Sequence, residues 1–352
     1  INYKLTGKTF TDYSLASRTL ALDINTNYWS DDMLRTAGVK ENCLPPIIKT
    51  GTLIGGLTKE SSSACGLREG TPVVMGGHDH PMASVAGNAY NGKRILNSCG
   101  TAEPYLYVSQ RNASIPKTNL GQRVGRHPDP TRYILWGGIV SSGICIEWAA
   151  KRLGMCSDWG YMAPDLDYDY LFSRCADVPC GSGGVLFTPY LRGSGTPNWN
   201  PMMKANFIGM NDSTTSRHMM RSVLEGLSYQ GNIIIKMHEK LSGEQVSEIC
   251  SVGGGSRGSL WMQIKADVTG KPIVTRQVDE ATGQGAAIAA GVGIDLFKSL
   301  EDGSAKFEKL DRTYIPSQKN HDTYNKIMPI FEKIHDAVKE ADISLHKFNL
   351  EN

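Results

Sequence analysis

PVVMGGHDHPMASVAGNAYNGKRILNSCGT, residues 72–101, is the stretch that decides the fold. An apolar run at 73–75 stops at two glycines and leads to Asp79, at what we expect to be a strand end. A second apolar run, 95–96, stops at a turn of small residues. Strand ends followed by small residues let backbone N–H groups approach an anion closely. The stretch therefore predicts Asp79 as a catalytic base and the Gly100-Thr101 turn as a phosphate contact.

Two other interpretations of this stretch stay open. An Asp after two glycines is also typical of a turn or a cap. His78 and His80, at i and i+2 on a strand, would share a face and could bind zinc together. The sequence shows no third ligand at a suitable spacing, so we assign no side chain as a metal ligand.

Chain length limits the number of domains, and net charge limits the kinds of partner that we expect. A chain of 352 residues is longer than one usual core, so we expect an α/β protein of two domains. The 37 Lys and Arg against 35 Asp and Glu leave a net charge of +2 without a basic run, which argues against nucleic acid or a membrane as partner. We therefore expect a small-molecule ligand, and a symmetric homodimer is compatible with the sequence.

Targeting signals and cysteine spacing indicate the compartment. No apolar stretch reaches the roughly 18 residues of a membrane span, and the first residues lack the form of a signal peptide. Eight cysteines occur without a CxxC pair, which is typical of reduced thiols. These observations predict a cytoplasmic protein.

Hydrophobic periodicity predicts an alternation of strands and helices. We expect strands at 133–139, 183–190, 205–210, 248–252 and 272–275. We expect helices at about 11–23, after Gly143, from a cap at Asp212 or Ser213 to Gly243, at 259–269, at 280–293 and along the C-terminal stripe 324–341. Residues 192–201, RGSGTPNWNP, contain too much Gly, Pro and Asn for regular structure and predict a loop.

Glycine turns form the main constellation. Strand, glycine turn and helix follow one another around residues 75, 99, 140 and 253, and near 253 three adjacent glycines precede a helix. N–H groups at a positive helix end favour a nucleotide, so several loops are expected to converge on one ligand. The same pattern would also suit a dehydrogenase or an ATPase.

One segment distinguishes between these classes of nucleotide-binding protein. Residues 204–226, KANFIGMNDSTTSRHMMRSVLEG, resemble the second signature of the FGGY carbohydrate kinases. The resemblance extends almost from end to end through the blocks LTGKTFTDYSLASRTL, GLREGTPVVMGGHDH, GTPNWNP, GGGSRGSLWMQIKADVTGKP and EATGQGAAIAAGVG.

The resemblance implies a ribonuclease H-like, actin-like fold of two lobes, with ATP and a sugar or polyol in the cleft between them. By this resemblance residues 1–75 are the tail of the N-terminal lobe, 76–300 are the C-terminal nucleotide-binding lobe, and 301–352 are a helical segment packed on that lobe. We expect ATP-dependent phosphorylation of a terminal hydroxyl of a ketose or polyol.

The resemblance also assigns residues to roles. Asp79 matches the catalytic base, and His80 and Tyr13 match positions that contact the substrate. The positions that match the nucleotide site are Gly100, Thr101, Gly143, Glu147, Gly254, Gly255 and Gly258. Mg²⁺ would bridge the phosphate oxygens, held mostly by water and by few protein ligands.

Some residues depart from the family pattern, and these departures affect the expectations about catalytic activity and substrate. Nothing matches the family's initial DxGTxxxR phosphate loop, so we expect either that the native chain continues upstream or that this chain alone is catalytically incompetent. His78 and His80 replace the more usual Gly and Asn or Gln, and Ser194-Gly195 replaces Glu-Arg, which leaves the substrate open. A truncated, inactive nucleotide-binding protein and an actin-like ATPase without a sugar substrate remain the alternatives.

Overall fold

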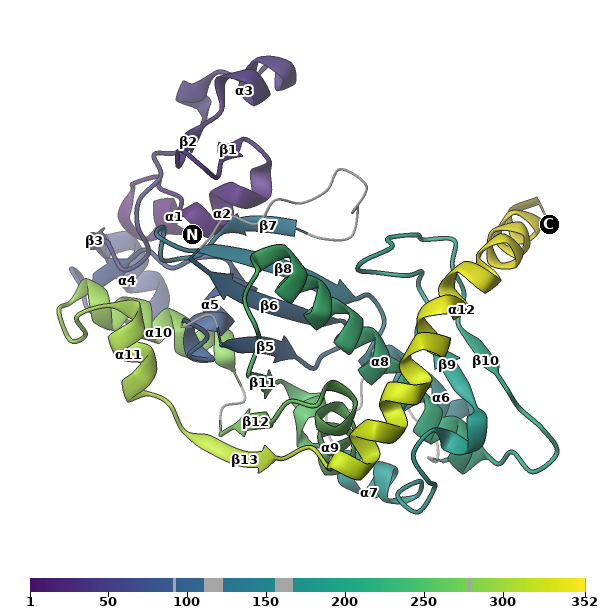
Figure 1. Cartoon of the computed structure of the whole chain (residues 1–352). Helices are drawn as coiled ribbons and strands as arrows, with labels where there is room; N and C mark the ends of the chain where they lie inside the picture. Colours follow the sequence, from purple (N-terminus) through teal and green to yellow (C-terminus); the bar gives the residue numbers. More distant parts are fainter. Residues whose placement is uncertain (91–92, 111–122, 156–166, 278–279, 352) are drawn as a thin grey trace.

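The main feature of the fold is a seven-stranded mixed sheet with the strand order β13-β12-β11-β5-β6-β8-β7 (Figure 1). The computed structural model describes residues 1–90, 93–110, 123–155, 167–277 and 280–351. The strands of this sheet are β5 (Arg94–Ser98), β6 (Glu103–Ser109), β7 (Arg123–Arg126), β8 (Tyr133–Ile139), β11 (Glu248–Val252), β12 (Ile273–Arg276) and β13 (Leu310–Tyr314). β11 runs parallel to β5 and β12, and the other neighbours are antiparallel.

Helices cover both faces of this sheet (Figure 1). On one face lie α8 (Ser216–Ser242) and α9 (Ser259–Thr269), and on the other lie α5 (Asp79–Ala86) and α10 (Ala281–Gly293). The alternation along β5 explains this, because Ile95 is buried in the core formed with α8 and α9 while Leu96 is buried with Ala83 and Ala86 of α5. Strands buried on both faces form the rigid centre of the molecule.

The remaining elements flank this centre. They are α6 (Gly143–Arg152), α7 (Tyr168–Ser173), η3 (Ser182–Gly184), β9 (Leu186–Thr188) paired antiparallel with β10 (Asn206–Ile208), η4 (Gly254–Arg257), α11 (Leu300–Lys306) and α12 (Gln318–Glu351). β9 packs against α8, and α12 packs against α9. The expected helical segment 301–352 also contains β13, the edge strand next to β12.

The first part of the chain forms small elements beside β7 (purple in Figure 1). They are α1 (Asn2–Thr6), α2 (Tyr13–Ala16), η1 (Ser17–Thr19), β1 (Leu22–Asp23) paired with β2 (Tyr28–Trp29), α3 (Asp31–Ala37), η2 (Glu41–Cys43), β3 (Leu53–Gly56) paired with β4 (Pro72–Val74), and α4 (Lys59–Cys65). α2 and η1 contact β7, and β4 contacts α10, so this part of the chain is packed on the α5 side.

Several expected elements are confirmed. The strands 133–139 and 248–252 and the helix 259–269 have the expected bounds. The strands at 183–190, 205–210 and 272–275 exist but are shorter or shifted by a residue. The loop 192–201 contains no helix or strand, only isolated bridges. Strong periodicity with glycine at the ends is therefore sufficient for these elements.

Two expected helices are wrong at their boundaries. The helix at 11–23 is only α2 followed by η1, because Leu20 adopts a left-handed backbone with φ 64° that ends it. The cap of α8 is Thr215, not Asp212 or Ser213, because Thr215 and His218 form a reciprocal capping box. A left-handed residue decided the first boundary and a side-chain cap decided the second.

Two predictions about residues 72–101 are also wrong. Asp79 does not end a strand, because β4 stops at Val74 and Asp79 is the first residue of α5. His78 and His80 therefore lie at a helix start, not on one face of a strand. The turn after β5 leads into the antiparallel strand β6, not into a helix.

The described residues bear on the predictions about membrane-spanning helices, metal ligands and free cysteines. None of the helices among them has the length and hydropathy needed to cross a membrane. The same residues contain no group of three or more His, Cys, Asp or Glu that could hold a metal ion. The seven described cysteines are free thiols, and Cys156 lies outside the described residues.

A close approach of α5 and α10 fixes the helix that carries Asp79. A Cβ atom on Gly285 would lie 2.0 Å from the carbonyl oxygen of Met82, whereas a Cβ on Gly283 would have no neighbour closer than 3.8 Å. Gly285→Ala should therefore lower the free energy of unfolding by about 1–3 kcal/mol. Gly283→Ala, the matched control, should leave it unchanged or raise it by up to about 1 kcal/mol. Chemical denaturation measures both, and equal effects would contradict the packing argument.

Acid should destabilise the contact between α5 and β7 through His127. This buried ring accepts a hydrogen bond from the Asp129 N–H and lies 3.2 Å from the Ser84 hydroxyl of α5. Burial lowers the pKa of His127 from its usual 6.5 to about 3. Because the unfolded chain binds this proton first, stability is lost as the pH falls from about 6.5 toward 3.

His127→Gln should remove this dependence. Between pH 6.5 and 5 the wild-type free energy of unfolding should fall by about 2 kcal/mol more than that of the variant. Urea denaturation at several pH values measures the difference. Parallel pH profiles would show that His127 is not responsible.

Candidate functional site

The turn that delivers Asp79 is held by a buried carboxylate. Asp12 is fully buried and accepts hydrogen bonds from the Ser14 hydroxyl at 2.6 Å and from the Thr50 hydroxyl at 3.2 Å. The Ser14 oxygen in turn accepts the His78 N–H at 2.9 Å. A Cβ on Gly77 would lie 2.8 Å from that oxygen, so only glycine suits this position. Two segments far apart in sequence thus fix the residue before Asp79.

Asp79 itself projects from the first turn of α5. Its side chain is 63% exposed, and its Oδ1 accepts the His80 N–H at 2.7 Å and lies 2.6 Å from His78 Nδ1. Burial lowers the pKa of His78, which favours its neutral form near pH 7. The described contacts of this carboxylate use Oδ1, so Oδ2 is available to a ligand.

A cavity of about 230 Å³ opens at His80, the residue after Asp79, and we call it the cavity beside Asp79. His80 forms part of its wall, and its ring packs edge to face on Trp136 with centroids 5.0 Å apart. Ala102, the residue after Thr101, lines the same cavity, as do Arg123 and residues of the loop 192–201. The cavity therefore extends from the residue after Asp79 to the residue after the expected phosphate turn.

The loop 192–201 is anchored from two sides. Thr196 donates its N–H to the Gly138 carbonyl and accepts the Gly138 N–H on its hydroxyl, both at 3.1 Å. Its carbonyl accepts the side-chain amide of Gln230 on α8 at 2.7 Å. Thr196 and Trp199 line the cavity beside Asp79.

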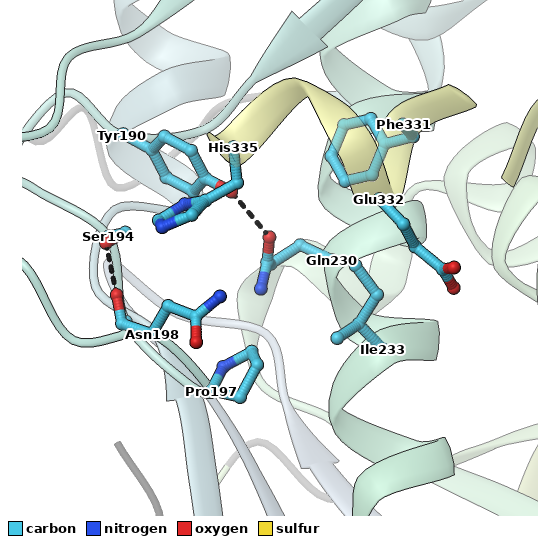
Figure 2. A pocket seen from close by; sticks show the side chains of 10 residues that line it. Tyr190, Ser194, Pro197, Asn198, Gln230, Ile233, Phe331, Glu332 and His335 are labelled. Atoms are coloured by element: carbon cyan, nitrogen blue, oxygen red, sulfur yellow. Dashed lines mark hydrogen bonds between the residues drawn. The ribbon is translucent and has the colours of Figure 1, made fainter. Parts of the chain in front are cut away.

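A second cavity, of about 190 Å³, lies between this loop, α8 and α12 (Figure 2). The Tyr190 hydroxyl donates to Gln230 at 3.1 Å there, and the buried ring of His335 on α12 packs on Tyr190 (Figure 2). This packing supports the face of the loop that does not line the first cavity.

The expected phosphate turn lies against the start of α6. Gly143 donates its N–H to the Gly100 carbonyl at 3.0 Å, and Ser142 donates to the Thr101 carbonyl at 2.9 Å. A Cβ on Gly143 would lie 2.8 Å from the Gly100 oxygen. The structure thus brings Gly100, Thr101 and Gly143 together, and glycine at 143 permits the contact.

A buried polar network lies beneath this turn. The ammonium of Lys265 contacts Glu103 directly and donates to Asn97 at 2.8 Å, and the Ser142 hydroxyl donates to the other Glu103 oxygen at 2.6 Å. Burial alone would lower the pKa of Lys265, but Cys99 and Glu103 raise it above its usual value. The network joins β5, β6, α9 and the start of α6. Sequence analysis missed it, because a Lys inside an amphipathic helix predicts an exposed position.

The glycine-rich segment 253–258 contacts the other side of the turn. Gly255 donates its N–H to the Cys99 carbonyl at 3.0 Å. Cβ atoms on Gly255 and Gly258 would lie 2.8 Å from Trp261 and 2.4 Å from Phe172, whereas a Cβ on Gly254 would meet no atom within 4 Å. Gly255 and Gly258 are therefore required by packing, and Gly254 faces open space where a ligand could approach.

Glu147 lies on α6 in the same region. It is partly buried, and burial raises its pKa. Burial and the charge of Glu147 raise the pKa of Tyr168, while Arg257 lowers it, so both charges act on this ring. Tyr168 and Arg257 were not among the expected residues. Arg257 could have been found, because it lies within the glycine-rich segment.

Tyr13 and His80, the two residues expected to contact the substrate, line different cavities. Its side chain lines a hollow of about 650 Å³ together with Trp29, Pro45 and neighbouring residues of the N-terminal part. The next residue, Ser14, lines a smaller recess with Arg18 and Trp136. The structure therefore brings His80, but not Tyr13, into the cavity beside Asp79. Arg18 and Arg123 were missed, because single exposed residues on short elements carry no periodic signal. Trp136 was missed because it lies partly buried on the predicted strand 133–139, where an apolar side chain is expected in any case.

The chain belongs to the FGGY family of carbohydrate kinases. Residues 1–86 match the N-terminal domain of this family and residues 95–294 match its C-terminal domain. Members of the family with known structures have the actin-like, ribonuclease H-like fold, and the mixed sheet with helices on both faces agrees with it.

Particular relatives are similar over nearly the whole chain. The xylulose kinase of Bacillus subtilis is 24% identical over 348 residues, which cover 99% of this chain and 67% of that protein. The ligand-bound xylulose kinase of Lactobacillus acidophilus superposes with a TM-score of 0.85 and 25% identity, covering 96% of this chain and 66% of the other. The gluconate kinase of Lactobacillus acidophilus gives a TM-score of 0.87 and 25% identity, with 98% and 67% covered. The chain spans about two thirds of the length of these relatives.

Removal of the Ser14 hydroxyl should loosen the turn before Asp79. Ser14→Ala leaves the buried Asp12 carboxylate and the His78 N–H each without one partner, which should cost about 1–3 kcal/mol of folding stability. The His78 amide should also exchange its hydrogen faster. Ser63→Ala, an exposed change on α4, should stay within about 0.5 kcal/mol of wild type. Denaturation and hydrogen exchange measure the two effects, and an unchanged His78 exchange rate would refute the anchoring role.

Proposed function

We propose that this protein transfers the terminal phosphoryl group of ATP to a hydroxyl group of a ketose, polyol or related sugar, with Asp79 as the general base. One observation carries the proposal: a single cavity is lined by His80, directly after Asp79, and by Ala102, directly after Thr101. A substrate in this cavity would lie between the candidate base and the candidate phosphate turn. The membership of the family supports the same reaction class.

The arrangement suits proton removal by a carboxylate. Phosphoryl transfer needs alignment and charge neutralisation more than covalent chemistry from the protein. Asp79 is anchored through Oδ1 by the His80 N–H, so Oδ2 could accept the proton of the attacking hydroxyl. His80 and Tyr13 are the proposed substrate contacts, with Tyr13 reached from the adjoining hollow.

We assign the nucleotide to the glycine-rich turns. Gly100, Thr101 and the N-terminus of α6 at Gly143 would face the phosphates, where backbone N–H groups favour anions. Gly254 would lie under the adenosine part with Gly255 and Gly258 as packing supports, and Glu147 would lie beside it. Mg²⁺ would supply charge neutralisation on the phosphates. Such an ion would be held mainly by water and by few protein ligands.

The substrate and the lobe boundaries belong to the proposal as well. The names of the relatives include a neutral ketose, xylulose, and a sugar acid, gluconate, so a ketose, polyol or related sugar is the class and no single sugar follows. We propose that residue 75 ends the first lobe, that 76–300 form the second, and that 301–352 pack on it. We do not propose nucleic acid as a partner. A homodimer is compatible with the fold. A cytoplasmic location suits a metabolic kinase.

Asp79→Asn tests the proposed base. The amide cannot accept the proton, so sugar-dependent ADP formation by the intact natural protein should fall by roughly 10²–10⁴-fold. Because Asp79 is outside the proposed nucleotide site, the dissociation constant for ATP should change by less than about threefold. Coupled assay of ADP formation and calorimetric titration with ATP measure these quantities.

The outcomes separate the candidate functions. Unchanged turnover of sugar by Asp79→Asn would refute the role of Asp79. ATP hydrolysis that no carbohydrate accelerates would favour an actin-like ATPase. ATP binding without any turnover by the wild type would favour the non-catalytic alternative.

A further inference from the structure

Two arginines near Asp79 have no acidic partner in a short ion pair. Arg18 and Arg123 line one recess together with Trp136, and Arg123 and Trp136 also line the cavity beside Asp79. Among the described residues, neither guanidinium forms an ion pair with a carboxylate within 4 Å. Other cleft-side arginines of the chain, such as Arg94 and Arg132, each bind one or two carboxylates. The recess therefore carries excess positive charge.

The groups that face these arginines do not cancel that charge. Asp79 is the carboxylate that acts on Arg18, and Arg123 opposes it by repulsion, so that burial and Arg123 together lower the pKa of Arg18. His78 and His80 are the other titratable groups beside Asp79, and neither adds negative charge. Arg126, whose described hydrogen bonds go to carbonyl and hydroxyl oxygens, lines the same recess as a third permanent cation. An anionic group of a ligand would remove the repulsion.

Aromatic rings orient both guanidinium groups. Arg18 lies over the Trp136 ring at 4.9 Å from its centroid, and Arg123 lies 5.9 Å from the centroid of Trp199. Stacking restrains a planar guanidinium and leaves its N–H edge free for a carboxylate. The arginines are therefore prepared to bind without a large loss of side-chain freedom.

The recess that contains Arg18 is not lined by residues of the expected phosphate turn. Ala102 and Pro104, at the phosphate turn, line the cavity beside Asp79 but not the recess that contains Arg18. The recess is instead lined by Ser14 and Ser17 of the N-terminal part. Arg18 therefore lies toward the end where the acceptor would bind.

We propose that Arg18 and Arg123 bind an acidic group of the acceptor, so that the preferred substrate is a sugar acid bearing a carboxylate, not a neutral ketose or alditol. This inference rests on the proposed function. The carboxylate would pair with the guanidinium edges while a hydroxyl at another carbon approaches Asp79. Charge-assisted, bidentate pairs of this kind select strongly for the anion.

Matched ligands test this with the 352-residue chain. The probes are D-gluconate against D-glucitol and D-xylonate against xylitol, titrated by calorimetry in the presence and absence of ADP. At least one acid should bind about tenfold or more tightly than its alditol, with an affinity that falls as salt is added. Arg18→Gln and Arg123→Gln should each remove most of this preference. Arg35→Gln, on the distant α3 and paired with Asp32, is the control and should retain it.

The titrations distinguish an acidic acceptor from a neutral acceptor and from a nucleotide phosphate. Alditols or ketoses that bind as tightly as the acids would overturn the acidic substrate and leave the proposed kinase function standing. Weakened ADP binding in the arginine variants with no effect on the acids would assign the cations to a nucleotide phosphate and also overturn the inference. Absence of both carbohydrate and nucleotide binding in the wild type would remove the proposed function together with the inference.

Discussion

The proposed nucleotide end of the site depends on one buried ion pair. Lys265 and Glu103 are both nearly inaccessible to solvent, and their charges are compensated only by each other and by neutral hydrogen-bonding groups around them. A buried pair of this kind contributes less to net stability than its contact suggests, but the loss of one partner is costly, about 3–5 kcal/mol. The pair therefore specifies one arrangement: β5, β6, α9 and the Ser142 end of α6 must come together for either charge to be satisfied. The Gly100-Thr101 turn is the surface of that arrangement.

The acceptor end is fixed from the opposite face of the sheet by different means. α5 is held by close backbone contact with α10 at Gly285, by His127 from the segment after β7, and by the Asp12 and Ser14 network in front of its first turn. None of these contacts shares a residue with the Lys265 network. Because strands β5 and β6 lie between the two supports, the separation between Asp79 and the phosphate turn is set by the rigid centre of the sheet, not by the loops themselves.

Sequence reasoning succeeded where the signal is local and periodic, and failed where it depends on a distant partner. Strand β11 and helix α9 follow directly from buried runs between glycines. The long strand β6 was missed although every residue of it is buried, because Glu103 and Pro104 at its start conceal the strand pattern. The start of α5 at Asp79 could not be read either, since its N-cap His78 is held by Ser14, 64 residues earlier, and makes no side-chain cap of its own. The glycines stand out in the sequence, but only the structure separates Gly254, which faces open space, from Gly255 and Gly258, which are required by packing.

The two ends of the cavity differ in the kind of group that they offer, and this difference has a consequence for specificity. At the glycine turns the polar groups are main-chain N–H and C=O groups, several of which pair with one another, and substitution of a side chain does not remove them. At the other end the walls are side chains, His80, Trp136, Trp199, Arg18 and Arg123, contributed by separate segments and held mostly by ring contacts. Such side chains can change without disturbing the buried Lys265 network or the α5 and α10 contact. The names of two structural relatives, xylulose kinase and gluconate kinase, include a neutral sugar and a sugar acid, so one fold serves different acceptors. In this chain the proposed phosphate contacts are formed by backbone at Gly100 and Gly143, whereas the charge near Asp79 comes from side chains that substitution can change without disturbing the sheet.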